Sequence, residues 1–181
     1  EDHISNTAFH IQIFKALNSN APNFAHHPFL TDQEGKGFGK RIGSLSIENL
    51  KSEGYEDISI INYLINIGSS VDIKPEKKID NIINNFDIKN ISNSSAKFSY
   101  TVLKHLNSDI LKIYNYEEIK SKINLSDNKV DIKKLWKFSQ NNIEFLKDLE
   151  DWLKTVEVTI DIKNYEIPNT LIKAAIECIP N

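Results

Sequence analysis

The placement of glycine is the feature of this sequence that most constrains its fold. All six glycines lie within the first 68 residues, and none follows Gly68. Residues 69–181 are rich in lysine and carry apolar side chains at three- and four-residue spacing, which predicts helices. The charge balance changes at the same point, from five Lys/Arg against eight Asp/Glu in residues 1–68 to seventeen against seventeen afterwards. The sequence therefore predicts a mostly α chain with a boundary near Gly68.

The composition suits one medium domain or two small ones, and 40% apolar residues are enough for a core. The net charge of −3 excludes a globally basic nucleic-acid binder, but it leaves room for a local basic patch. A single cysteine cannot form an internal disulfide, which indicates a reducing, cytoplasmic setting. No apolar run is long enough to span a membrane, and no signal peptide is visible. Because the chain has no methionine and opens on Glu1, we expect a piece of a longer protein.

Apolar spacing and capping residues predict a succession of helices. The first is expected over 7–17 with Thr7 as its cap, and the second between Ser46 and Gly54. Further helices are predicted over 56–68, from Pro75, over 99–106, 108–113 and 116–123, from about Asp131 through Val156, and over 169–179. The third helix is expected to bury Ile58, Ile61, Leu64 and Ile65. Residues 156–162 alternate well enough to predict a strand.

The stretch Glu34–Ser44 combines four glycines with Lys36, Lys40 and Arg41, the only arginine in the chain. Glycine amides can approach an anion closely, and cationic side chains stabilise negative charge that develops in a transition state. The spacing fits neither a Walker loop, which needs four residues before its G-K pair, nor the dinucleotide fingerprint. By pattern alone, a solvated basic turn is the simpler interpretation.

The neighbouring segments extend this interpretation. "EDHISNT", "KRIGSLSIENLKSEGY", "INYLINIG" and "KFSYTVLKHLNSDIL" together resemble bacterial glutamyl-tRNA synthetases, which are class I aminoacyl-tRNA synthetases, and "KRIGSLSIENL" is most similar to the alphaproteobacterial branch. The resemblance covers nearly the whole chain. It implies three parts: the tail end of a Rossmann-type catalytic domain with a KMSKS-type loop over 1–45, a helical stem-contact domain over 46–125, and the start of a helical anticodon-binding domain over 126–181.

The resemblance also implies site residues. "GFGKR" occupies the KMSKS position, so Lys40 matches the second lysine of the motif and is the expected catalytic residue. Gly37 and Gly39 stand where most members have lysine and serine, and Lys36 is a candidate to substitute in part for the missing lysine. The residues expected to bind ATP are Lys40, Gly37, Phe38, Gly39, Arg41, His3 and Ile4. Asp2 is expected as a polar residue of the amino-acid and nucleotide pocket.

The implied function is ATP-dependent ligation of glutamate to tRNA through a glutamyl-adenylate, with Mg²⁺ accompanying the nucleotide. The expected partners are glutamate and tRNA-Glu, with tRNA-Gln as a further acceptor, and the full-length enzyme is expected to be a cytoplasmic monomer. This chain alone is expected to be inactive.

Two alternatives stay open. One is a non-catalytic RNA-binding remnant, which the departures at Gly37 and Gly39 favour. The other is a related synthetase, such as one that charges tRNA-Gln with glutamate. Glutaminyl-tRNA synthetases have β-barrels in the region where this chain has a helical pattern, after residue 68. This pattern therefore argues against a glutaminyl-tRNA synthetase.

Other features have simpler interpretations. His26 and His27 are adjacent on an extended segment and point to opposite sides, so no metal site is predicted. The three lysines 133, 134 and 137 could meet a tRNA backbone, but a solvated helix face is the default. Trp136 and Trp152 fall on the helix stripe and are expected in the core, and Cys178 is expected to be a buried small hydrophobe.

Overall fold

The computed structural model describes residues 3–38, 45–123 and 130–157. Within these ranges the fold is mostly helical, as predicted, and strand structure is confined to one two-residue parallel pair. The elements are α1 (Ile4–Ala16), β1 (Leu30–Thr31), α2 (Ile47–Glu53), α3 (Asp57–Asn66), α4 (Ile79–Asn85), the 3-10 helix η1 (Ile88–Asn90), β2 (Ala96–Lys97), α5 (Tyr100–Ile113), α6 (Tyr116–Ile119), α7 (Ile132–Ser139) and α8 (Asp148–Glu157).

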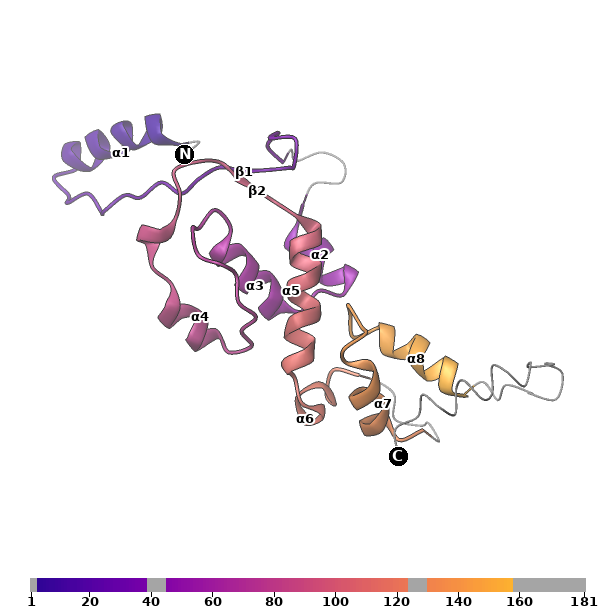
Figure 1. Ribbon diagram of the computed structural model, residues 1–181. Helices are drawn as coiled ribbons and strands as arrows, with labels where there is room; N and C mark the ends of the chain where they lie inside the picture. The colour runs from indigo at the N-terminus through magenta and orange to yellow at the C-terminus, as the bar shows by residue number, and fades with distance from the viewer. Residues whose placement is uncertain (1–2, 39–44, 124–129, 158–181) are drawn as a thin grey trace, which may run out of the picture.

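The helices are arranged along the central helix α5 (Figure 1). α3 packs against α5 and α2 packs against α3, while α7 contacts both α6 and α8. The β1–β2 pair lies beyond the N-terminal end of α5, and α6 and α7 lie at its C-terminal end (Figure 1). α5 therefore lies between the strand pair on one side and α6 and α7 on the other.

Two hydrophobic clusters form the core, and α5 contributes to both. The first cluster consists of Leu50, Tyr55, Ile60, Tyr63, Phe98, Leu103, Leu106 and Ile110. The second consists of Leu111, Ile119, Leu135, Trp136, Ile143, Leu149 and Leu153. Sequence neighbours on a helix point about 100° apart, so Ile110 and Leu111 can belong to different clusters. Trp136 is 3% exposed and Trp152 packs against the second cluster, which confirms the core interpretation of both.

The predicted boundaries of α2 are confirmed. The Ser46 hydroxyl accepts a hydrogen bond from the Asn49 amide at 3.0 Å, which satisfies a free N–H of the first turn. Gly54 ends the helix with φ of 104°, in the left-handed region that glycine tolerates without strain. Ser99 likewise caps α5 by accepting from the Val102 amide.

Two predicted starts are wrong. α1 begins at Ile4, with His3 at the cap position, and the Thr7 hydroxyl lies inside the helix, where it donates to the His3 carbonyl. α4 begins at Ile79 rather than at Pro75. The intervening residues stay extended because the Asn62 side chain, buried on α3, donates a hydrogen bond to the Lys74 carbonyl.

Helix continuity also differs from prediction. Residues 99–113 form one helix, α5, instead of two, and α6 ends at Ile119 instead of Ile123. The apolar stripe predicted from Ile132 to Val156 packs in the second cluster as far as Leu153, but Val156 is 54% exposed, and the stripe belongs to two helices separated by residues 140–147. Val156 and Glu157 are the end of α8, so the predicted strand is wrong at its start. The rest of that strand, the final helix and Cys178 lie outside the described residues.

The face of α3 that enters the core was predicted one position out of phase. Ser59, Ile60, Asn62 and Tyr63 are its buried residues, whereas Ile61 is 39% exposed and Leu64 is only half-buried. The reason is the hydroxyl of Tyr63, which accepts a hydrogen bond from the Ser99 amide at 2.7 Å and fixes the helix against the start of α5.

Candidate functional site

The glycine-rich loop leaves the fold from the short strand β1. Leu30 and Thr31 pair with Ala96 and Lys97, and the amide of Phe98 donates to the Thr31 carbonyl at 2.8 Å. Thr31 is 4% exposed, although it is polar, because its hydroxyl reaches the Ala96 carbonyl at 3.4 Å. The strand pair therefore holds the start of the loop against the first cluster.

Asp32 builds the turn that follows. Its Oδ1 accepts hydrogen bonds from the amides of Glu34 at 2.9 Å and Lys36 at 2.8 Å, and its own amide donates to the Lys36 carbonyl. Gly35 occupies the left-handed region at φ 86°, and Gly37 then bridges back to Thr31 in antiparallel fashion. The role of Asp32 was not predicted, although an aspartate three residues before a glycine is a common turn signal.

Both ends of the segment 39–44 are attached to one hydrophobic cluster. Phe38 packs edge-on against the buried Phe98, with ring centroids 6.0 Å apart. Leu45 packs against the same first cluster, one residue before the Ser46 cap of α2. Gly39, Lys40 and Arg41 are within this segment, which lies outside the described residues.

Gly37 has a packing role that the sequence did not reveal. A β-carbon at this position would lie 2.6 Å from Cε1 of the Phe29 ring, well inside van der Waals contact. The absence of a side chain at position 37 therefore makes room for an aromatic ring of the same chain, and the predicted contact of Gly37 with ATP stays a prediction. Lys36, the candidate substitute for the missing lysine, forms an ion pair with Glu34 at 2.8 Å, and both side chains are about three-quarters exposed.

The other predicted nucleotide-binding residues lie at the start of α1. His3 is exposed, its carbonyl accepts from the amides of Asn6 and Thr7, and its Nδ1 lies 2.9 Å from the Asn6 side-chain nitrogen. Ile4 is 54% exposed. Among the residues that the structure describes, no hydrogen bond or ion pair joins this helix start to Gly37 or Phe38. Asp2 lies outside the described residues.

An apolar pocket of about 540 Å³ lies beside β1, between residues 25–30, the end of α3 and the segment around η1. His26, His27 and Pro28 line one wall, and Phe86 and Ile88 line another. Its lining has no Lys, Arg, Asp or Glu, so it offers no charged group to a triphosphate. Within residues 3–38, 45–123 and 130–157, no group of three or more His, Cys, Asp or Glu side chains could hold a metal ion.

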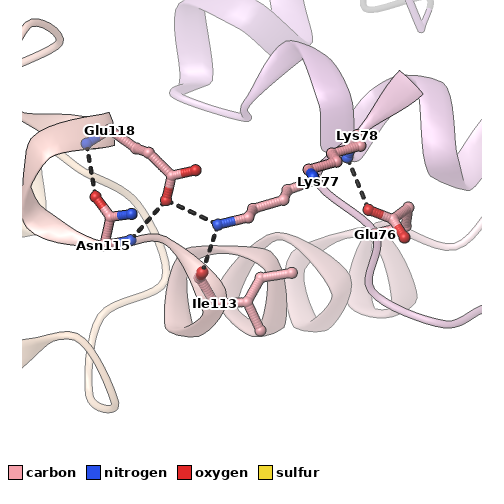
Figure 2. Close-up of polar contacts among 6 residues, drawn as sticks. All are labelled: Glu76, Lys77, Lys78, Ile113, Asn115 and Glu118. Atoms are coloured by element: carbon pink, nitrogen blue, oxygen red, sulfur yellow. Dashed lines mark hydrogen bonds and ion pairs between the residues drawn. The ribbon is translucent and has the colours of Figure 1, made fainter. Parts of the chain in front are cut away.

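A polar junction fixes the segment before α4 to the C-terminal end of α5 (Figure 2). The Lys77 ammonium donates to the Ile113 carbonyl at 3.1 Å and to the Glu118 carboxylate at 2.8 Å. Glu118 also accepts from the Asn115 amide at 2.8 Å, while the Asn115 side chain accepts from the Glu118 amide, forming a capping box. The hydrogen bonds from Lys77 and Asn115 lower the pKa of Glu118 below its ordinary value.

Tyr114, the residue after α5, is the centre of a second set of contacts at this junction. The ammonium of Lys122 lies 5.1 Å from the Tyr114 ring centroid and forms an ion pair with Glu56. Burial raises the pKa of the Tyr114 hydroxyl. Tyr114 packs against both hydrophobic clusters, so these contacts join the two halves of the core. No helix in the described part of the chain is long and apolar enough to cross a membrane.

Comparison with known proteins identifies the family. Residues 1–105 match the family model described as tRNA synthetases class I (E and Q), catalytic domain. This match extends past the boundary predicted at residue 45, and the second cluster draws on both sides of the boundary predicted at 125. The three-part division of the chain stays a prediction.

Curated relatives match along most of the chain. Glutamate–tRNA ligase 2 of Beijerinckia indica is 34% identical over 160 residues, covering 87% of this chain and 36% of that protein. Glutamate–tRNA ligase 1 of Rickettsia felis is 31% identical over 181 residues, covering 99% of this chain and 40% of that protein. Glutamate–tRNA ligase of Azospirillum brasilense is 34% identical, covering 97% and 39%. The chain thus spans 36–40% of the length of these relatives.

Solved structures give the same fold. The glutamate tRNA ligase of Elizabethkingia meningosepticum superposes with a TM-score of 0.67 at 22% identity, covering 99% of this chain and 43% of that one. The glutamate–tRNA synthetase of Elizabethkingia anophelis gives a TM-score of 0.63 at 23% identity, covering 83% and 36%. With the family match over residues 1–105, more than half of its length, the chain belongs to the class I tRNA synthetases of the glutamate and glutamine (E and Q) family.

Proposed function

We propose that this chain is part of an enzyme that ligates glutamate to tRNA at the expense of ATP, through a glutamyl-adenylate. The observation that carries the proposal is that relatives named glutamate–tRNA ligase match 87–99% of the chain at 30–34% identity. The proposed acceptor of the glutamate is tRNA-Glu. The alternative is that the enzyme also charges tRNA-Gln with glutamate. We further propose that the full-length enzyme acts in the cytoplasm as a monomer.

Lys40 is the proposed catalytic residue. The loop that carries it starts and ends on one hydrophobic cluster, at Phe38 and Leu45, so only six residues separate two fixed points. Six residues span a limited distance, so Lys40 must lie within reach of these two points. Attack of the glutamate carboxylate on the α-phosphate of ATP places growing negative charge on the departing pyrophosphate. The Lys40 ammonium stabilises that charge in the transition state, which raises the rate and not only the affinity.

The charges of the loop fit a triphosphate. Residues 34–44 hold three cations against one acid, Glu34, and this acid is engaged by Lys36. Lys40 and Arg41 are thus the proposed phosphate-binding side chains, with Gly37, Phe38 and Gly39 contributing main-chain amides. At the start of α1, His3 and Ile4 are proposed to contact adenine through the main chain, with Asp2 as a polar pocket residue. Mg²⁺ would be held chiefly by the phosphates of ATP.

Lys40→Ala in the full-length protein tests this proposal. We expect ATP–pyrophosphate exchange, measured with tRNA present, to fall at least about tenfold, which corresponds to about 1.4 kcal/mol of barrier. The matched control is Lys51→Ala, which removes an exposed lysine on α2 whose one ion pair within the described residues is with Asp57 at 3.2 Å. This control should exchange at the wild-type rate.

The outcomes separate the open alternatives. An unchanged rate in Lys40→Ala would remove this residue from the mechanism. A wild-type protein that binds tRNA but neither exchanges pyrophosphate nor forms glutamyl-tRNA would be the non-catalytic remnant. Charging tRNA-Gln and tRNA-Glu transcripts side by side decides the acceptor.

A further inference from the structure

Phe98, the residue that follows β2, contacts the glycine-rich loop at three points. Its amide donates to the Thr31 carbonyl at 2.8 Å, and its carbonyl accepts a hydrogen bond from the Gln33 side chain. Its ring meets the Phe38 ring edge-on, with the two centroids 6.0 Å apart. The hydrogen bonds hold the start of the turn and the ring contact holds its end, so this one residue attaches both sides of the turn.

The Phe98 ring is itself held in place by its neighbours. It is 2% exposed, and its centroid lies 5.1 Å from that of the Tyr63 ring and 5.0 Å from that of the Tyr100 ring. The Tyr63 hydroxyl also accepts from the amide of Ser99, the next residue along the chain, at 2.7 Å. Because a close-packed interior leaves little room for a ring to shift, α3 and the start of α5 fix the position of Phe98.

The near end of the loop restricts Lys40 more than the far end does. Lys40 comes two residues after Phe38 and five residues before Leu45. A chain spans at most about 3.6 Å per residue, so the Lys40 Cα lies within about 7 Å of the Phe38 Cα, whereas the limit from the Leu45 Cα is about 18 Å. The contact between Phe38 and Phe98 therefore does more than the Leu45 end to decide which region the Lys40 ammonium can reach.

We infer that Phe98 is a positioning residue for Lys40. Through its contacts with the turn, it sets the place from which the Lys40 ammonium acts on the phosphates of ATP. In this role Phe98 acts through the loop and makes no contact with ATP or glutamate. The inference rests on the proposed function for the role of Lys40, and it adds that the cation is positioned from the packed start of α5.

Phe98→Leu in the full-length protein tests this inference, because leucine keeps a buried apolar side chain without the aromatic ring. We expect the kcat of ATP–pyrophosphate exchange, measured with tRNA present, to fall about three- to tenfold, because a displaced cation stabilises the transition state less well. The KM for glutamate should stay unchanged. The matched control is Ile110→Val, a substitution of a fully buried residue of the same cluster toward the other end of α5. It should lower the melting temperature and keep the wild-type kcat.

Double variants separate positioning from a general defect of the core. In Lys40→Ala the cation is absent, so adding Phe98→Leu should cause no further fall in kcat. Phe38→Leu removes the other ring of the pair at a half-buried position, and it should slow exchange about as much as Phe98→Leu does. The variant that carries both leucines should be no slower than either single variant. A core defect that leaves the loop in place would instead lower the rate by the same factor with and without Lys40.

Cleavage by trypsin measures the attachment of the loop without any catalysis by the enzyme. Trypsin cuts after lysine and arginine, so the cuts after Lys40 and Arg41 can be followed by mass spectrometry. We expect the rate of these two cuts to rise about threefold or more in Phe98→Leu and in Phe38→Leu, because a segment with fewer contacts opens more often. The rate should stay at the wild-type value in Ile110→Val.

These outcomes differ from those that test the proposed function. A wild type that exchanges no pyrophosphate, or a Lys40→Ala variant with the wild-type rate, would overturn the role of Lys40 and this inference with it. Slow exchange in Lys40→Ala together with a wild-type kcat in Phe98→Leu would overturn this inference alone. So would an additive loss in Lys40→Ala/Phe98→Leu, or unchanged cleavage after Lys40 and Arg41 in Phe98→Leu.

Discussion

At the scale of single residues, packing against a neighbouring ring restricts which residue can occupy position 37. In this fold the residue passes beside the Phe29 ring, where a β-carbon would lie 2.6 Å from the nearest ring carbon. Phe29 is 40% exposed, so the ring has some freedom to move away. Any side chain at Gly37, lysine included, would have to displace this ring.

We expect Gly37→Ala to lower the free energy of unfolding by about 1–3 kcal/mol, because the added methyl group overpacks the contact. The measurement is chemical denaturation of the wild type, both single variants and the double variant Gly37→Ala/Phe29→Ala. In the Phe29→Ala background the added methyl group should cost much less. Strict additivity of the two substitutions would show that the contact with Phe29 is not the cause.

The loop residues differ in how much of their role can be predicted from the sequence. The positions of Lys40 and Arg41 came from a motif, and motifs are local in sequence. The reasons for Gly37 and Asp32 depend on a ring eight residues away and on main-chain amides that face one carboxylate. Neither is visible until the chain is folded, although the turn at Asp32 has a sequence signal.

At the scale of elements, α5 shows why a polar residue inside a pattern need not break a helix. Asn107 is fully buried, and its side chain accepts from the Glu56 amide at 2.9 Å and donates to the Glu144 carbonyl at 2.6 Å. It therefore joins the start of α3 to the connection between α7 and α8. The sequence predicts a break between two helices at Asn107. Its two hydrogen-bond partners lie 51 and 37 residues away, so nothing in the neighbouring sequence indicates that this asparagine is buried inside one helix.

Asn107→Ala should lower the free energy of unfolding by about 2–4 kcal/mol, since two main-chain groups lose their partner in a buried place. Asn84→Ala on the exposed side of α4 is the control and should change stability by less than about 0.5 kcal/mol. Thermal and urea unfolding measure both. Similar losses in the two variants would mean that Asn107 has no special structural role.

The other errors in the predicted helix boundaries also arise from hydrogen bonds between residues far apart in sequence. The apolar stripe predicted over 132–156 is buried as far as Leu153, but the interruption at 140–147 was not predicted. Asp148 accepts from the amides of Glu144 and Phe145, both at 2.9 Å, and Ser108 donates to the Ile143 carbonyl. Periodicity identifies which residues are buried; tertiary hydrogen bonds decide where the helices stop.

At the scale of the whole molecule, the polar junction at the end of α5 makes stability depend on pH. The pKa of Glu118 is lowered in the folded protein by its bonds to Lys77 and Asn115. A carboxylate of this kind stabilises the fold above its unfolded pKa of about 4.3, and the contribution is lost as pH falls through the lower folded value.

Glu118→Gln should therefore be less stable than the wild type at neutral pH, and the difference should shrink as both proteins are titrated below about pH 4. Glu117→Gln is the matched control, because Glu117 is exposed on the same helix turn and its carboxylate has no hydrogen bond in the described part of the chain. Melting temperatures over a pH series provide the test. If the stability difference between Glu118→Gln and the wild type stays constant with pH, the lowered pKa of Glu118 does not stabilise the fold.

The buried residues of the first cluster end at Ile110 and those of the second begin at Leu111, so the boundary between the two clusters falls inside α5. A hybrid gene that took the distal part from a relative with a crossover after α6 would separate Leu111 and Ile119 from the five later residues of the second cluster, whereas a crossover between Ile110 and Leu111 would keep the residues of each cluster together. Exchange of modules between lineages is thus restricted to a few permissible joints, and shuffled libraries of such proteins should yield folded members almost exclusively from those joints.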